Sequence, residues 1–363
     1  MNQNSPIRVL CVFSTLDCGG AESMCMNLYR HMDRNKVQFD FVKHNSGTGV
    51  FEKEIKTLGG KIYEAPRLSP HNFIQYQQWW SRFLDEHEEY KIIHGHFFTI
   101  SAVYFRVAKK KGRFTVGHIH ASQSDGFLKT ILESQISKWT DYPIACSQEA
   151  GKWIYRKRPF TVLNNAIDTQ IFKYDPIKRK RIRDELDLGD ELVLGTVANL
   201  TSVKNPMGLI DIYLAVRCKC PHVKLLWVGE GRCRQRIEDR IRQEGIKESV
   251  LLLGARNDVP DLLQAMDVFL LPSFNEGLPV SVIEAQAAGL PCFVSDRVTK
   301  EVDITGLCRF LPISYINYWQ NMILCEKHAR ENTSKRILNA GYDIQETSQR
   351  LQDLYLRFAM GDK

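Results

Sequence analysis

Short runs of β-branched and other apolar residues alternate with longer amphipathic stretches along this 363-residue chain. The first run, residues 7–13, is followed by a glycine-containing turn and a helical pattern over residues 21–32. Because parallel strands must be joined by a crossover connection, usually a helix, this alternation predicts a parallel sheet with helices on both faces. Further strands are expected at residues 39–43, 61–63, 92–94, 114–117 and 142–146.

The alternation is interrupted once and then begins again. A polar, highly charged stretch occupies residues 173–190. The first strand of a second series is expected directly after it, at residues 191–197. Since 363 residues exceed one ordinary α/β core, we interpret the interruption as a boundary between two domains. In the second domain, further strands are expected at residues 223–228, 250–253, 268–271 and 292–294.

The predicted fold class is therefore α/β, with two Rossmann-like, doubly wound domains facing each other across a cleft. We expect an N-terminal domain over residues 1–170, a C-terminal domain over residues 171–340, and a C-terminal helix within residues 341–363 that packs back toward the N-terminal domain. Doubly wound sheets bind ligands at the carboxyl ends of their strands, so functional residues should directly follow strands.

The chain shows no membrane-spanning or secretory pattern. No segment approaches the roughly 18–20 uninterrupted apolar residues that a membrane span needs. The N-terminus lacks a basic n-region, so no secretory signal is expected. The ten cysteines are scattered without a CxxC pair, and Cys11, Cys25, Cys146 and Cys292 stand among apolar neighbours. These features predict a cytoplasmic protein whose cysteines are reduced and structural.

The net charge of +7 includes two dense basic runs. Lys and Arg cluster at residues 106–113 and, interleaved with Trp153 and Tyr155, at residues 152–158. Such runs suit an anionic membrane surface or a pyrophosphate-bearing acceptor, although taken alone they are more often solvated helix faces. No recognised nucleic-acid motif accompanies the charge, so a nucleic-acid partner is not expected.

The most informative segment is PSFNEGLPVSVIEAQAAGLP, residues 272–291. Pro279 stands near the first position of an expected helix, where its missing N–H costs least, and Gly277 allows a ligand to approach the backbone. Free amides and the helix dipole at this point would attract a diphosphate. Glu276 would reach sugar hydroxyls, while Glu284, about one and a half turns into the helix, would accept hydrogen bonds from a ribose diol. Taken singly, each glutamate is also compatible with an ordinary solvated helix residue.

This segment resembles the signature of glycosyltransferase family 4, whose members are retaining enzymes with the GT-B fold. Further similarities occur in the order of the family's motifs and cover essentially the whole chain. They are Gly19-Gly20-Ala21-Glu22, residues 164–168 with Phe172, Lys204-Asn205, Gly229-Glu230-Gly231, and residues 253–259. The ending Gly341-Tyr342-Asp343-Ile344 is similar to that of bacterial enzymes that build capsular or exopolysaccharide repeat units.

The resemblance implies a retaining transferase that moves a sugar from a nucleotide-sugar, with UDP favoured, to a glycan or polyprenyl-diphosphate-linked acceptor in bacterial surface polysaccharide synthesis. The N-terminal domain would bind the acceptor and the C-terminal domain the donor. The leaving diphosphate would help to accept the proton of the incoming hydroxyl, so no side-chain nucleophile is needed. No cofactor is expected, and the enzyme would be peripheral at the inner face of the cell membrane.

The family's motifs also imply roles for individual residues. His120, Lys204 and Glu276 are the expected catalytic residues, and His96 with His120 would contact the acceptor. Asn199 stands where the family usually has arginine, which removes a positive charge and a bidentate donor from the diphosphate site. We expect weaker donor binding, compensation by another cation, or an unusual donor. The implied donor-binding residues are Gly19, Gly20, Asn199, Lys204, Gly229, Arg256, Glu276, Gly277, Leu278, Pro279, Val280 and Glu284.

Two HxH pairs, His94 with His96 and His118 with His120, end two of the expected strands. This spacing is compatible with a metal site. None is predicted, because no acidic or cysteine ligand is evident nearby and the resembled family works without metal. The histidines would instead position hydroxyls or donate to a phosphate.

Other functions would use a similar nucleotide site. A GT-B nucleotide-sugar 2-epimerase would need a dedicated acid/base set and no acceptor, and product analysis distinguishes it from a transferase. Because Asn199 replaces the usual arginine, a non-catalytic subunit that assists a partner transferase is a further alternative. An NAD dehydrogenase is disfavoured, because neither first strand is followed by G-x-G-x-x-G.

Overall fold

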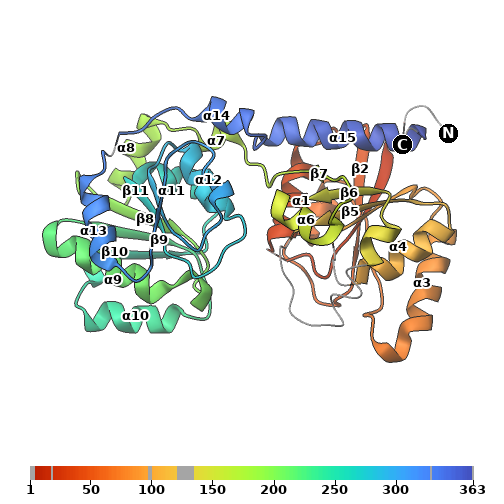
Figure 1. The fold of residues 1–363 in the computed structure, drawn as a ribbon, viewed down its shortest axis with the longest axis horizontal. Coiled ribbons are helices and arrows are strands. Elements are labelled where there is room, and N and C mark those ends of the chain that lie inside the picture. Colours follow the sequence, from red (N-terminus) through yellow and green to blue (C-terminus); the bar gives the residue numbers. More distant parts are fainter. Residues whose placement is uncertain (1–4, 18, 97–99, 121–134, 328, 362–363) are drawn as a thin grey trace. The chain divides into compact units, whose positions relative to one another are not determined.

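A computed structural model describes residues 5–17, 19–96, 100–120, 135–327 and 329–361. The chain forms two compact units (Figure 1). Unit 1 comprises residues 1–166 together with residues 341–363, and unit 2 comprises residues 167–340. The C-terminal segment therefore belongs to the same unit as the N-terminus.

Unit 1 contains a seven-stranded parallel sheet in the order β3-β2-β1-β4-β5-β6-β7. The order reverses between β1 and β4, which is the mark of a doubly wound sheet. The strands are β1 Ile7–Val12, β2 Val37–Lys43, β3 Ile62–Glu64, β4 Ile92–Gly95, β5 Phe114–Ile119, β6 Tyr142–Ala145 and β7 Thr161–Val162. The helices are α1 Gly20–His31, α2 Glu52–Thr57, α3 Phe73–Glu86, α4 Ser101–Lys110, α6 Gln148–Tyr155 and α15 Ile344–Met360.

The side chains of β1 alternate between two apolar layers of unit 1. Val9 and Cys11 pack with α1 and α15 on one face of the sheet, whereas Leu10 and Val12 pack with α3 and α4 on the other. Figure 1 shows α15, in blue, running along this unit. Because successive residues of a strand face opposite sides, burial of both sets means that helices cover both faces.

Unit 2 contains a six-stranded parallel sheet in the order β10-β9-β8-β11-β12-β13, which reverses between β8 and β11. The strands are β8 Val193–Val197, β9 Lys224–Val228, β10 Val250–Gly254, β11 Val268–Leu271, β12 Cys292–Ser295 and β13 Cys308–Leu311. The helices are α7 Thr169–Phe172, α8 Pro176–Glu185, α9 Pro206–Lys219, α10 Arg234–Gln243, α11 Val259–Ala265, α12 Val280–Ala287, α13 Ile316–Cys325 and α14 Ser334–Asn339.

A buried carboxylate holds the two central strands of unit 2 together. Asp267, immediately before β11, accepts a 2.8 Å hydrogen bond from the backbone N–H of Val193 in β8. Its two oxygens also lie 2.6 Å from Arg179 and 3.3 Å from Arg183 of α8. Since buried carboxylates need such compensation, the contacts fix α8 against the strands that border the reversal of strand order.

The structure confirms the predicted α/β class with two doubly wound parallel sheets. Two edge strands, β7 and β13, were not predicted. β7 has only two residues, and β13 carries Arg309, which interrupts the apolar run that signals a buried strand. Both strands exist because they pair with a neighbouring strand, β7 with β6 and β13 with β12. A local sequence pattern does not indicate such pairing.

Candidate functional site

The carboxyl ends of β8 and β11, where the strand order of unit 2 reverses, carry most of the residues predicted to bind a donor. Residues 198–205 follow β8, and residues 272–279 follow β11 before α12 begins. The backbone N–H of Phe274 donates to the carbonyl of Val203 at 2.8 Å, which joins the two loops. Doubly wound sheets bind ligands at such reversals, so these loops form the candidate site.

Lys204 and Glu276 form a direct ion pair between these two loops. Lys204 ends a short 3-10 helix and is followed by Asn205, whose side chain caps α9. Glu276 also forms a parallel backbone bridge with Val298, in the segment that follows β12. The Lys204 and Glu276 side chains are 21% and 15% exposed, so a ligand can reach the pair. Two predicted catalytic residues are thus direct neighbours.

The N-terminus of α12 offers a positive electrostatic environment. Pro279 is its N-cap residue, and the first turn of this fully described helix contains no acidic side chain that would offset the helix dipole. A Cβ on Gly277 would meet open space. Ser273 Oγ, buried at the end of β11, has no hydrogen-bond partner among the described residues. Together with Leu278 and Val280, these residues form an entry to α12 that suits an anion.

Glu284 lies on α12 and is partly buried. Burial raises the pKa of its carboxyl to about 7, so the protonated and ionised forms coexist near neutral pH. A ligand that donates hydrogen bonds to this carboxyl would favour the ionised form. Carboxyl groups with such shifted pKa values are concentrated at functional sites, which makes Glu284 part of the candidate site.

Gly229 is required by the close packing of the loops after β8 and β9. Its φ is +145°, and a Cβ there would lie 2.1 Å from the carbonyl oxygen of Ala198, next to Asn199. The backbone N–H of Leu200 also donates to the carbonyl of Glu230 at 2.9 Å. Gly229 therefore fixes the position of the Asn199 backbone.

Arg256, after β10, is engaged with a neighbour in its own loop. Its guanidinium contacts both carboxylate oxygens of Asp258 at 2.8 and 2.6 Å, and the hydrogen bonds lower the pKa of Asp258. Both side chains are exposed, so solvent screens the pair and it contributes little to stability. A donor phosphate could displace Asp258 at little cost.

In unit 1, the loop after β1 leads into α1 through Gly19 and Gly20. Gly19 is the N-cap residue of α1, and a Cβ there would lie 2.2 Å from the carboxylate of Glu22. A Cβ on Gly20 would meet open space. The turn therefore leaves room beside the N-terminus of α1, at the strand-order reversal of this sheet.

The two HxH pairs form one cluster at the carboxyl ends of β4 and β5. His96 Nδ1 lies 2.9 Å from His120 Nε2, and the ring centres of His94 and His96 are 4.1 Å apart. The rings of His118 and His120 are stacked at 4.2 Å. Burial lowers the pKa of His94 and of His120 to about 3, so both rings are neutral. The two residues expected to contact the acceptor, His96 and His120, are therefore in contact with each other.

Two further groups that the sequence analysis missed join this cluster. Tyr355 of α15 hydrogen-bonds to His94 Nδ1 at 2.5 Å across 261 positions of sequence, a separation that carries no local signal. The expectation that no cysteine lies near the histidines is wrong, because Cys11 and Cys25 each have Sγ within 4.8 Å of a nitrogen of His96. The alternation of β1 could have indicated which face Cys11 occupies, but not what covers that face.

Comparison with known families matches both halves of the chain. Residues 18–171 match the model described as Glycosyltransferase Family 4. Residues 178–305 match the model described as Glycosyl transferases group 1. Each match includes the residues that the sequence analysis singled out in that half, from Gly19 to His120 and from Asn199 to Glu284.

Individual proteins resemble this chain over more than half of its length. The chain is 30% identical to EpsF of Bacillus subtilis, which carries a provisional glycosyltransferase name, over 97% of each chain. It is 29% identical, over 54% of each chain, to the UDP-Gal:alpha-D-GlcNAc-diphosphoundecaprenol alpha-1,3-galactosyltransferase of Escherichia coli. Among solved structures, a Rickettsia africae glycosyltransferase has a TM-score of 0.79 at 14% identity, covering 99% of this chain and 100% of that one. Anabaena HepE in complex with UDP has a TM-score of 0.77 at 19% identity, covering 96% and 99%. These similarities confirm the predicted GT-B fold.

The two glycines of the candidate site in unit 2 are expected to respond differently to substitution. Gly229→Ala should lower the free energy of unfolding by about 2 kcal/mol or more, because the residue has positive φ and its Cβ would overlap a backbone carbonyl. Gly277→Ala should change it by less than about 0.5 kcal/mol, because its Cβ meets open space. Chemical denaturation of both variants measures the difference. Equal stability of Gly229→Ala and wild type would contradict the described packing.

Proposed function

The chain belongs to glycosyltransferase family 4, and from this membership we propose that it transfers a sugar from a UDP-sugar to a lipid-linked glycan in bacterial surface polysaccharide synthesis. The observation that carries the proposal is the ion pair of Lys204 with Glu276 beside the entry to α12. By their names, the Escherichia coli relative uses UDP-galactose and a diphosphoundecaprenol-linked acceptor, and the HepE structure contains UDP. These two names support a nucleoside diphosphate as the ligand of the site.

Donor binding would rearrange the ion pair. The diphosphate carries more negative charge than one carboxylate, so Lys204 would turn to the phosphates, and the amides at the start of α12 would add hydrogen bonds. Glu276, released from Lys204, could accept hydrogen bonds from the donor sugar, while Glu284 accepts them from the ribose diol. Asn199 cannot supply a guanidinium, so Lys204 has the larger share of charge neutralisation.

Transfer with retention needs few chemical groups from the protein. The bond from the anomeric carbon to the diphosphate breaks, a bond to the acceptor oxygen forms on the same face, and the hydroxyl proton passes to the departing diphosphate. Lys204 and the α12 amides would stabilise the charge that develops on the leaving group. His120, neutral because burial lowers its pKa to about 3, would hydrogen-bond to and orient the acceptor hydroxyl. No metal at the diphosphate is required by this scheme.

The first test is a screen of UDP-sugars that measures free UDP in the presence of a polyprenyl-diphosphate-linked glycan. We expect UDP release that depends on the acceptor, that continues in EDTA, and that falls about 100-fold or more in Lys204→Ala, since the leaving diphosphate then lacks its cation. Lys180→Ala is the matched control, because Lys180 is an exposed cation on α8 of the same unit.

Three results would contradict the proposal. Activity that is lost in EDTA and restored by Mg²⁺ or Mn²⁺ would show a metal at the donor. Epimerised donor without transfer would identify an epimerase. Full activity of Lys204→Ala would remove Lys204 from the diphosphate site.

A lipid-linked acceptor requires the protein to reach a membrane surface. No helix in the parts of the chain that the structure describes has the length and apolar character to cross a bilayer. Of the two basic runs, Lys109 is paired with Asp141 and Lys111 with Asp85. Arg158 donates to backbone carbonyls instead. Arg106 is exposed and lies over the Trp139 ring, with 5.9 Å from its guanidinium carbon to the ring centre. The other exposed cations of the two runs for which the described residues show no ion pair are Lys110, Lys152, Arg156 and Lys157.

We propose that these four cations attach unit 1 to an anionic membrane surface. Each would contribute about 1 kcal/mol near an anionic leaflet. Changing all four to Gln should therefore abolish co-sedimentation with anionic vesicles, whereas wild-type binding should fade as salt rises, because exposed charges are screened over about 10 Å at 0.1 M.

The matched control changes the same number of exposed cations in unit 2, namely Arg232, Arg236, Lys247 and Lys335, to Gln. It should sediment like the wild type. Equal binding of wild type to neutral and anionic vesicles, or equal loss in both variants, would show that the basic runs are only solvated helix faces.

A further inference from the structure

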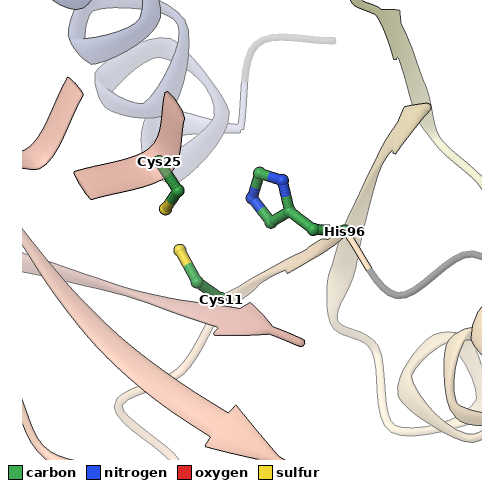
Figure 2. A group of neighbouring side chains, drawn as sticks. All are labelled: Cys11, Cys25 and His96. Carbon is green, nitrogen blue, oxygen red and sulfur yellow. The ribbon is translucent and has the colours of Figure 1, made fainter. Parts of the chain in front are cut away.

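Two thiols and an imidazole meet in the core of unit 1. Cys11 lies on β1, Cys25 on α1, and His96 directly follows β4 (Figure 2). The two sulfurs and one nitrogen of His96 all lie within 4.8 Å of one another. Exposures of 0% for Cys11, 1% for Cys25 and 6% for His96 exclude solvent from all three. We call these residues the thiol–imidazole cluster.

The His96 ring is held in one orientation. Its Nδ1 contacts His120 Nε2 at 2.9 Å, and its face stacks on Phe13 with ring centres 4.4 Å apart and planes 8° apart. Its Nε2 is buried and has no hydrogen-bond partner among the described residues. Figure 2 shows an edge of the ring turned toward the two sulfurs. The fixed ring therefore offers one unused nitrogen to the thiols.

An unpartnered imidazole nitrogen is costly in a core, because burial removes its hydrogen bonds to water and nothing replaces them. Several accumulate here: buried nitrogens without a partner among the described residues also occur on His94, His118 and His120. A core that needed only apolar volume would use aliphatic or phenyl side chains. The arrangement indicates that these nitrogens have a ligand.

A second buried thiol pair offers a comparison within the same chain. Cys292 and Cys308 are Cα partners of neighbouring strands β12 and β13 in unit 2, and the Cys292 thiol lies 3.3 Å from the carbonyl oxygen of Leu290. Among the described residues, the groups able to surround a metal ion include Cys11 and Cys25 but neither of these two. The unit 2 pair therefore behaves as ordinary core thiols, and the imidazole distinguishes the pair in unit 1.

We propose that Cys11, Cys25 and His96 bind a structural Zn²⁺ ion. Zinc favours thiolate sulfur at about 2.3 Å and imidazole nitrogen at about 2.0–2.1 Å in tetrahedral geometry, and donors within 4.8 Å of one another need only small shifts to reach it. Two thiolates neutralise the charge of Zn²⁺, so a buried complex carries no net charge. On binding, two S–H bonds break and both protons leave to solvent.

The neighbouring histidines complete the environment of this site. His94 and His118 form a second group with His96 but do not belong to the group with the two thiols, so the proposed ligands from the chain are Cys11, Cys25 and His96. His120, through its contact with His96 Nδ1, fixes the orientation of the liganding ring, as outer partners of zinc-bound histidines commonly do. The ion would join β1, α1 and β4 where the strand order of unit 1 reverses.

The zinc proposed here is independent of the donor diphosphate, which the residues of unit 2 would neutralise. Its test therefore measures metal content rather than turnover. The full chain, expressed with added zinc and purified without chelator, is analysed for metals by mass spectrometry. We expect about one zinc per chain, and at least a tenfold lower content in Cys25→Ser, because a structural site needs its thiolates. Cys292→Ser, the matched control, should keep the wild-type content.

A spectroscopic measurement covers the case in which Cys25→Ser fails to fold. Wild-type protein loaded with Co²⁺ should show a thiolate-to-cobalt charge-transfer band and the intense visible absorption of a tetrahedral site, both retained in Cys292→Ser. Less than about 0.1 zinc per wild-type chain, equal zinc in Cys25→Ser and wild type, or a Cys11–Cys25 disulfide in the purified chain would overturn the proposal.

Discussion

The reversal of strand order in each parallel sheet is the constraint on which the functional geometry depends. Parallel strands need crossover helices, and where these helices leave toward opposite faces, the carboxyl ends of two adjacent strands stay uncovered. In unit 1, these ends lead to Gly19 and His96. In unit 2, they lead to Lys204 and Glu276. Residues far apart in the sequence therefore meet at two places that follow from topology alone.

The sequence predicted these places but not the contacts within them. The segment 272–291 is contiguous and follows a clear apolar strand, so Glu276 and Glu284 could be assigned to one site. The ion pair of Glu276 with Lys204 and the raised pKa of Glu284 depend on loop packing and burial, which no local pattern encodes. Cys11, Cys25 and His96 come from three separate elements, so the spacing of the cysteines in the sequence did not indicate that these side chains lie close together.

The two units use polar groups in opposite ways. The candidate donor site in unit 2 keeps the ion pair of Lys204 with Glu276 partly exposed, where a charged ligand can exchange with one partner. In unit 1, His94 and His120 are neutral because burial lowers the pKa of each ring, which suits positioning of a hydroxyl or coordination of a metal rather than binding of an exposed anion. A zinc ion in the thiol–imidazole cluster would hold His96 and, through it, His120 in place.

The central claim, that unit 2 binds the nucleotide through α12, is tested most directly by calorimetry of UDP binding near pH 7 in buffers of different ionisation enthalpy. Because the pKa of Glu284 is about 7 and the ribose diol would favour its ionised form, wild-type protein should release up to about half a proton per UDP bound. Glu284→Gln should bind roughly ten- to a hundredfold more weakly, without proton release. Unchanged affinity in Glu284→Gln, with the same proton release as wild type, would contradict the account.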